Sequence, residues 1–414
     1  MHNIKSELKS YLESKKEDIA ARLVEMVSHK STVSIEHSIQ TYLFDYLESQ
    51  GLHPEYENVE DSITNDPDYT FVPGHTTYAG RPNIKINIPG TGGGKSAILN
   101  THSDVVSAPD EMFTAHYKDG IVYGRGACDA KGQVATVILA VQALKSLGIQ
   151  LKGDLQAQIV IEEEAGGNGS LSLIRHGNKA DCAVVLEPTS LRMHPANRGA
   201  VWYKLTVKGK PVHMGKYWDG VSAIDEMVGL IGILREYETI LREASKGNPL
   251  FSHDPSPVVV NIGRIHGGDW PSMLPAECSI EGGIAFLPNK RISDIYDEVT
   301  SLIESRASAW AKENYTFEFC KLHNEAFETP VDHPSVVAFD KAHKSVLGND
   351  PMVGWIASCD ARLFARTGEM PTITFGAGDL GHAHSLDEQI IIDDILRAAE
   401  VLVMFLVDWC GVDK

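Results

Sequence analysis

The chain of 414 residues lacks several features that would assign it to common classes of protein. Its apolar runs stay short of the roughly 18 residues that a membrane-spanning helix needs, so we expect no membrane partner. The charged N-terminal segment 1–27 has neither the apolar stretch nor the small-residue cleavage site of a secretory signal. Basic residues are scarce: 37 Lys and Arg stand against 56 Asp and Glu, a formal net charge of -19. This argues against nucleic acid as a partner, because binding phosphates requires clustered basic side chains.

Paired cysteines are also missing. The six cysteines are scattered and form no Cys-x-x-Cys motif, which predicts reduced thiols and a cytoplasmic location. Apolar residues make up 43% of the chain, as in an ordinary globular protein. The length exceeds what one core usually serves, so two domains are expected.

Short apolar runs alternate with helical patterns along much of the chain. The clearest helical pattern is 131–148. Strands that alternate with helices indicate an α/β fold with a largely parallel sheet. The runs that resemble buried strands are 83–88, 96–101, 155–161, 182–187 and 371–376.

The middle of the chain has a different order, strand–helix–strand–strand–helix–strand. This order is typical of a ferredoxin-like α+β domain. We therefore predict an inserted domain at 197–322, with 1–196 and 323–414 forming the other domain. The elements expected in the insertion are strands at 201–209, 256–265, 277–286 and 315–322 and helices at 221–243 and 291–313.

Acidic residues and histidines follow the predicted strands, where an open α/β sheet binds its ligands. A lone histidine or a Glu run is usually structural, but here the Glu run at 162–164 directly follows a buried apolar strand. Converging carboxylates would repel one another without a cation, and a mixed N/O set suits zinc, cobalt or manganese. Asp104, two residues after His102, is placed to orient that histidine. The metal-ligand candidates are His102, Asp129, Glu164, Glu187 and His384.

Five motifs carry a resemblance to a known family. In order, HSDVV, GRGACDAKG, EEEAGGNGS, LEPT and GHAHSLDE resemble the metallopeptidases that include aminoacylases, acetylornithine deacetylases, succinyl-diaminopimelate desuccinylases and glutamate carboxypeptidases. The acetylornithine deacetylases are the most similar in character. The resemblance implies a zinc-exopeptidase-like catalytic domain that holds two zinc ions. It also implies that the inserted domain is a lid through which two copies dimerise.

The resemblance assigns a role to each metal-ligand candidate. Asp129 would bridge two metals, His102 and Glu187 would complete one site, and Glu164 and His384 would complete the other. His382 competes with His384, but the family's ligand precedes a short stretch that ends in Asp-Glu, which favours His384.

Further roles follow from the same resemblance. Glu163 matches the general base, and Asp104 belongs to the catalytic set as the partner of His102. The bond between Asp129 and Ala130 would be a cis peptide, which is rare without proline.

The inserted domain and a later motif suggest contacts to the substrate. GKPVHMG resembles the segment whose histidine, here His213, stabilises the oxyanion in the partner subunit's site. Asn261 and Ser272 belong to the matching strand and loop, although many relatives have Asn where Ser272 stands. Arg362 in SCDAR would bind a carboxylate, unless it forms a structural ion pair. Many relatives have Asp-x-Arg where this chain has Gly283-Ile284-Ala285, so a usual carboxylate contact is missing.

We therefore predict an amide hydrolase that uses two divalent metals, zinc first and cobalt or manganese as alternatives. Its substrate would be a small N-acyl compound carrying a short acyl group, acetyl or formyl, since no second arginine is evident to hold a dicarboxylic one. A dipeptidase or carboxypeptidase is the alternative enzyme, and a non-catalytic metal-binding protein is the alternative outside enzymes. We expect a homodimer formed through the inserted domain.

Overall fold

The apolar runs form a six-stranded mixed sheet in the order β1-β2-β6-β3-β7-β14. The four strands β6, β3, β7 and β14 are parallel, while β1 and β2 run antiparallel at one edge. The predicted α/β class with a largely parallel sheet is confirmed. The strands are β1 (Glu55–Glu57), β2 (Asn83–Ile88), β3 (Ala97–His102), β6 (Leu155–Val160), β7 (Ala183–Val185) and β14 (Thr372–Thr374).

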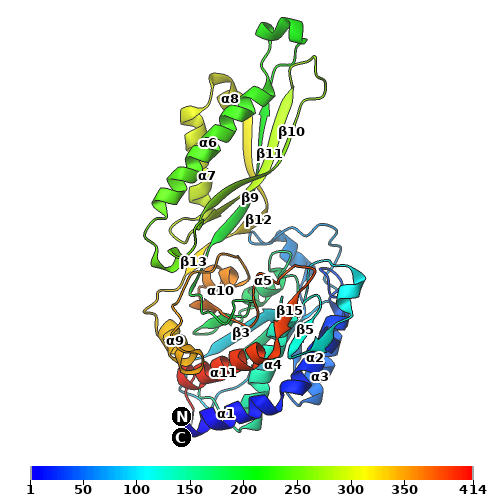
Figure 1. Ribbon diagram of the computed structural model, residues 1–414, viewed down its shortest axis with the longest axis vertical. Coiled ribbons are helices and arrows are strands. Elements are labelled where there is room, and N and C mark those ends of the chain that lie inside the picture. Colours follow the sequence, from blue (N-terminus) through cyan, green and yellow to red (C-terminus); the bar gives the residue numbers. More distant parts are fainter. Residues whose placement is uncertain (1, 413–414) are drawn as a thin grey trace. The chain divides into compact units, whose positions relative to one another are not determined.

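The computed structural model describes residues 2–412, which fold into two units (Figure 1). The main unit comprises the described residues up to 196, residues 328–355 and those from 359 onward. The inserted unit comprises residues 197–327 and 356–358. Among residues 2–412, none of the helices combines the length and apolar character needed to cross a membrane.

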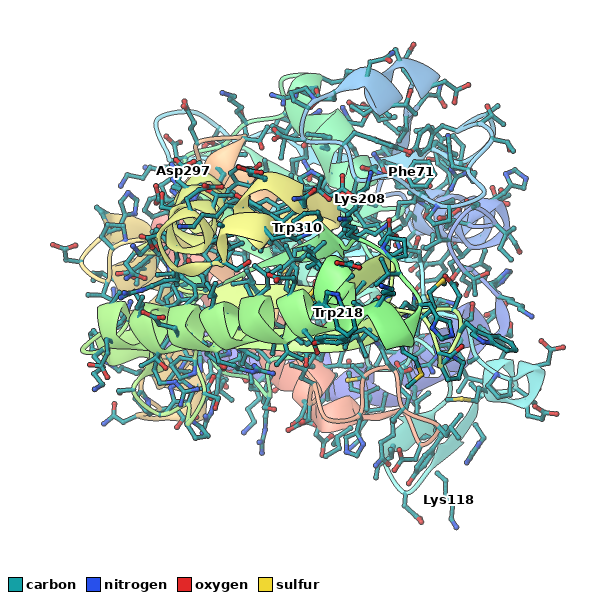
Figure 2. The ribbon with its side chains drawn as sticks, turned by 90° about the horizontal axis from the view of Figure 1, so that it is seen from above. Phe71, Lys118, Lys208, Trp218, Asp297 and Trp310 are labelled. Carbon is teal, nitrogen blue, oxygen red and sulfur yellow. The ribbon has the colours of Figure 1, made fainter. Side chains whose placement is uncertain are left out.

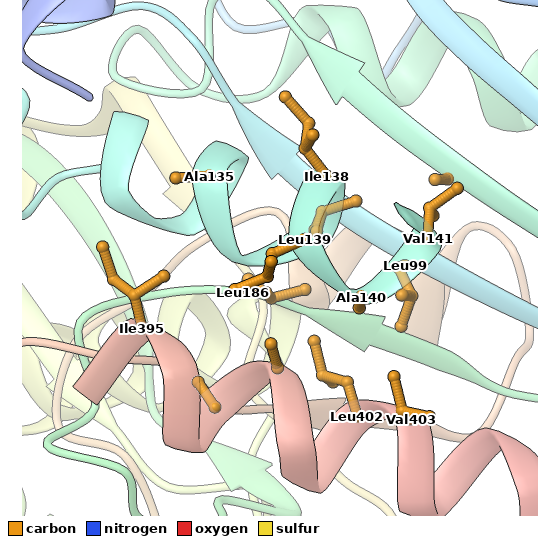
Figure 3. Packing of buried hydrophobic residues seen from close by; sticks show 14 of the residues in the cluster. Leu99, Ala135, Ile138, Leu139, Ala140, Val141, Leu186, Ile395, Leu402 and Val403 are labelled. Carbon is orange, nitrogen blue, oxygen red and sulfur yellow. The ribbon is translucent and has the colours of Figure 1, made fainter. Parts of the chain in front are cut away.

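Helix α4 (Lys131–Ser146) lies in the core of the main unit and is buried along nearly its whole length. It is apolar on almost every side, as expected of a helix that is enclosed by protein. Helix α11 (Ile392–Trp409) packs against it, and Figure 3 shows apolar side chains of both helices meeting beside Leu99 of β3. Each buried leucine contributes about 1.5–3 kcal/mol relative to exposure, so this layer holds the sheet in place behind the site.

The remaining helices of the main unit surround this core. Helices α1 and α2 contact α4 and α11, α9 packs on α11, and α10 contacts α5, β7 and β14. A small antiparallel sheet in the order β15-β5-β4 lies in the same unit. These elements are α1 (His2–Ser14), α2 (Lys16–Ser28), α3 (His37–Ser49), α5 (Asn168–Arg175), α9 (Pro334–Leu347), α10 (Ala361–Arg366), β4 (His116–Lys118), β5 (Ile121–Tyr123) and β15 (Gln389–Ile391).

The inserted unit has an antiparallel sheet in the order β10-β11-β9-β12. Its chain order is β9-α6-β10-β11-α7-α8-β12, which follows the predicted βαββαβ order except that two helices stand where one is expected. Trp310 of α8 donates from Nε1 to the carbonyl of Lys208 at the end of β9, at 2.8 Å, and thereby fastens α8 to the sheet (Figure 2). The elements are β9 (Gly199–Lys208), α6 (Ala223–Ala244), β10 (Val259–Gly267), β11 (Glu277–Phe286), α7 (Ile292–Arg306), α8 (Ala309–Asn314) and β12 (Tyr315–Asn324).

Two predicted elements of the inserted unit differ from the structure. The single helix expected at 291–313 is two helices, because Ala307 and Ser308 adopt extended backbone and the Ser308 hydroxyl caps α8 by accepting from the amide of Ala311. The strand expected from residue 256 begins at Val259. Pro257 precedes it, and proline has no amide hydrogen to offer a neighbouring strand.

Candidate metal centre

The carboxyl ends of β3, β6, β7 and β14 carry the site, because parallel strands present these ends at one edge. His102 is the last residue of β3. Glu163 and Glu164 follow β6, Glu187 follows β7, and the loop after β14 leads to His384. The strand-end positions inferred from the sequence are therefore the positions that bring these side chains together.

Within the described residues, the chemically suitable side chains form two groups. Ligand atoms of His102, Glu163 and Glu187 lie within 4.8 Å of one another, and so do those of Asp129, Glu164 and His384. His382, the rival of His384, lies outside both groups, and its Nε2 is 3.4 Å from the Gln389 amide nitrogen.

Asp129 faces both groups. Its Oδ1 lies 3.1 Å from His102 Nε2, and its Oδ2 lies 3.3 Å from His384 Nε2. A carboxylate with one oxygen toward each histidine has the geometry of a bridging ligand. The Asp129–Ala130 peptide is cis, which confirms the expectation drawn from the resemblance.

The electrostatics of the site are suited to bound cations. Burial, together with the charge of Glu187, holds the pKa of Glu163 well above its usual range. Burial and the charge of Asp129 raise the pKa of Glu164 to about 7. Hydrogen bonds to Asp129 and Glu164 raise the pKa of His384 to about 10. Glu187 Oε1 is buried without a hydrogen-bond partner among the described residues. This mixed N/O donor set, with an orphaned carboxylate oxygen, fits divalent metals such as zinc.

Asp104 contacts both His102 and the loop that carries Glu163 and Glu164. His102 Nδ1 lies 3.0 Å from the backbone carbonyl oxygen of Asp104 and 3.4 Å from its Oδ1. The Nδ1 hydrogen can thus be donated to Asp104, which leaves Nε2 free to act as a ligand. The Asp104 carboxylate also accepts from the amides of Glu163 at 3.1 Å and Glu164 at 3.0 Å, so it holds the loop that carries both glutamates.

Glu388 organises the loop of Asp129, a role that its position in the sequence, shortly after His384, did not indicate. Its Oε1 accepts from the amides of Gly126 at 2.9 Å and of Cys128 and Asp129 at 3.0 Å. Its other oxygen pairs with Arg125. The available signal was an acidic residue shortly after a candidate ligand and directly before a strand.

Arg362 and Asp360 pack against the loop that follows Glu163. Arg362 is buried and donates from Nη2 to the carbonyl of Gly166 at 2.7 Å. Asp360 was not among the sequence candidates. Its Oδ1 lies so close to Gly167 that any β-carbon there would collide with it, and Gly167 has a φ of 82°. Glycine is thus required at position 167 by the close approach of Asp360 and by backbone that favours glycine.

The other three sequence candidates lie in the inserted unit. His213 is exposed, and its Nδ1 accepts from the amide of Gly215 at 3.1 Å. The amide of Met214 donates to the carbonyl of Ser272 at 2.9 Å, so the structure brings His213 and Ser272 together. Asn261 stands on β10, paired with Gly283 of β11.

Comparison with known proteins agrees with this geometry. Residues 98–408 match the model of Peptidase family M20/M25/M40. The chain is 28% identical to the N-formyl-4-amino-5-aminomethyl-2-methylpyrimidine deformylase of Bacillus subtilis (strain 168), over 81% of this chain and 85% of the relative. It is also 28% identical to the acetylornithine deacetylase of Myxococcus xanthus, over 78% and 82%. The aminopeptidase PepT of Bacillus cereus shares the fold, with a TM-score of 0.75 at 21% identity over 95% of this chain and 98% of that one.

Proposed function

Because the chain belongs to Peptidase family M20/M25/M40 and is a metal-dependent amide hydrolase, we propose that it removes a short acyl group, formyl or acetyl, from a small amine. The observation that carries the proposal is Asp129, whose two oxygens face His102 of one ligand group and His384 of the other, together with Glu163 as a member of the first group. Removal of a formyl or acetyl group is the activity that the names of the curated relatives describe.

We assign the residues that would hold two divalent metals as the resemblance implies. Asp129 would bridge them, with His102 and Glu187 on one and Glu164 and His384 on the other. Metals bound there would lower the pKa of a water and polarise the substrate carbonyl. Zinc suits the donor set best, with cobalt and manganese as alternatives.

Glu163 is the proposed general base. It is held by Asp104 through its amide, and its Oε2 lies 3.9 Å from His102 Nε2, so its carboxylate is aimed at the same space as the ligands. In this role it takes the proton of the attacking water and passes it to the leaving amine. His213 would donate a hydrogen bond to the developing oxyanion, a contribution of about 3–4 kcal/mol when the donor is preorganised.

We infer a short acyl group because few cationic side chains are placed to pair with a carboxylate on the acyl group itself. Ala285 stands where many relatives have a lid arginine, and Arg362 already donates to Gly166. We propose that Arg362, with Asn261 and Ser272, lines the substrate site, and that the leaving amine supplies any carboxylate bound there. A dipeptidase remains the second candidate, favoured by the likeness in fold to the aminopeptidase.

A substrate series tests this specificity. Formyl and acetyl forms of one amine should turn over at least about tenfold faster than the succinyl form. Burying the unpaired succinyl carboxylate costs free energy, and each ~1.4 kcal/mol added to the activation free energy lowers the rate tenfold. The measurement is kcat/KM at a fixed metal concentration, with dipeptides as the comparison. Fastest turnover of the succinyl form would show that another cation replaces the lid arginine, and fastest turnover of dipeptides would favour the peptidase.

We further propose a homodimer formed through the inserted unit. Apolar side chains are exposed on α6, where Val228 is 63% exposed, and on the edge strand β10, where Ile265 is 57% exposed. Trp218, labelled in Figure 2, is 73% exposed. An exposed edge strand beside apolar side chains is suited to pairing with a second copy. We propose a cytoplasmic location because none of the six cysteines, which all lie within the described residues, forms a disulfide.

Mixing two inactive variants tests the dimer and the role of His213 together. His213→Ala should be inactive alone, as should Glu163→Gln. If His213 serves the partner's site, random exchange of subunits restores one intact site in each mixed dimer, and about a quarter of the parental activity should return. A monomeric enzyme of full activity, or mixtures that stay inactive although mixed dimers form, would contradict the arrangement.

A further inference from the structure

A buried ion-pair network lies behind the loop of Glu163, and two of its members precede the residues that match the family model. Glu36, Arg81 and Glu162 are each at most 4% exposed. Arg81 Nη1 donates to Glu36 Oε2 at 2.8 Å and to Glu162 Oε1 at 2.9 Å, and Nη2 donates to the same Glu162 oxygen at 2.9 Å. One guanidinium thus joins carboxylates from the start of α3 and from the end of β6.

The second oxygen of Glu162 is held as firmly as the first. The Tyr78 hydroxyl donates to Oε2 at 2.6 Å, and Asn168 Nδ2 donates to it at 3.1 Å. The Arg81 guanidinium also lies 4.8 Å from the centroid of the Tyr78 ring. Glu162 therefore has buried donors on both oxygens, and they come from three residues: Tyr78 and Arg81 in the segment before β2, and Asn168 at the start of α5.

The backbone conformation of Glu162 explains why its side chain needs these hydrogen bonds. Its φ is 60°, in the left-handed region that a residue with a β-carbon rarely adopts. This turn directly precedes Glu163 and Glu164, whose side chains enter the two ligand groups. The Asp104 carboxylate holds the amides of these two residues from the other side.

Arg81 is not needed merely to attach its own segment. Arg175 fastens the same segment to the end of α5 through Asp66 at 2.8 Å and Asp68 at 2.8 Å. Thr70 and Asn168 exchange hydrogen bonds at 3.1 and 3.0 Å. Since a buried ion pair carries a large desolvation cost, apolar packing could have served stability alone.

We propose that Arg81 is a positioning residue of the hydrolase. By joining Glu36 to Glu162, it fixes the backbone turn at Glu162 and so aims Glu163 and Glu164 at the ligand groups. This inference rests on the proposed roles of Glu163 and Glu164.

The test compares Arg81→Met with Arg81→Lys and uses Arg175→Met as the matched control. Arg81→Met should lower kcat by about 10–100-fold with little change in KM, because a catalytic group displaced by about 1 Å costs on this order. Arg81→Lys keeps one charge and should recover part of kcat. Arg175→Met loosens the same segment without touching Glu162 and should keep parental kcat. In a Glu163→Gln background, Arg81→Met should have little further effect, since the two act on one step.

A second readout does not depend on turnover. With two cobalt ions bound, Arg81→Met should change the visible absorption spectrum, because Glu164 would move, while Arg175→Met should leave the spectrum as in the parent. If Arg81→Met does not fold, Tyr78→Phe, which removes only one donor to Glu162, should lower kcat severalfold and change the same spectrum. Parental kcat and spectrum in the folded Arg81→Met or Tyr78→Phe variant would overturn the inference. If the parent hydrolyses no amide, the proposed function fails, and the cobalt spectrum alone decides the inference.

Discussion

Replacing Glu163 with glutamine is expected to lower kcat by at least about 10²–10⁴-fold, the range for loss of a general base. Glutamine has the same shape as glutamate but cannot accept the proton of the attacking water. A carboxylate oxygen of Glu163 lies within 4.8 Å of ligand atoms of His102 and Glu187, and the backbone amide of Glu163 donates to Asp104. Because the five other residues of the two groups are unchanged, the metal content should stay at the parental value. Steady-state kinetics and elemental analysis of the same preparation measure both quantities.

The neighbouring glutamates supply the controls for this experiment. Glu162→Gln leaves Glu163 intact and should lose much less activity, because an amide can still accept one hydrogen bond from Arg81. If Glu163→Gln keeps parental activity while Glu162→Gln is inactive, the roles within the Glu run are displaced by one residue. If Glu163→Gln loses a metal, Glu163 is a ligand, and the proton acceptor must be sought elsewhere.

Replacing Asp129 with alanine is expected to remove most of both metals and with them the activity. The two oxygens of Asp129 face one histidine each, His102 at 3.1 Å and His384 at 3.3 Å. Loss of a bridging carboxylate removes a ligand from both sites at once and leaves the remaining carboxylates without their shared partner. Metal content by elemental analysis is the measurement, with His384→Ala for comparison.

Two variants of the loop that carries His384 serve as comparisons for Asp129→Ala. His384 belongs to one group only, so His384→Ala should weaken the binding of one metal and largely retain the other. Asp387→Ala changes an exposed acidic residue of the same loop and should retain both metals. An Asp129→Ala protein that holds both metals as tightly as the parent would show that this carboxylate is not a bridge.

Local sequence signals predicted the sheet and the strand ends that carry three of the candidate ligands, while the resemblance supplied the roles of Asp129 and His384. Each of His102, Glu164 and Glu187 follows a short apolar strand, and parallel strands must bring these positions to one edge. The choice between His382 and His384 came from the motif, and the structure places His384 in a group with Asp129 and Glu164.

Contacts between distant parts of the chain could not be predicted from local sequence signals. Glu388 binds amides more than 250 residues away, and Arg81 reaches Glu162 from 81 residues earlier. Neither pairing leaves a periodic or spaced pattern in the sequence, because its partners are chosen by tertiary packing. The break between α7 and α8 was missed for a related reason: the apolar pattern continues through it, and only the Ser308 cap marks the new start.

The most direct test of the two-metal hydrolase is the metal content of the purified protein, measured together with its activity on a formyl and an acetyl amine. We expect roughly two divalent metals per chain, loss of activity when a chelator removes them, and recovery when zinc or cobalt is returned. A protein that binds no metal, or whose amide hydrolysis continues unchanged after complete removal of metal, would contradict it.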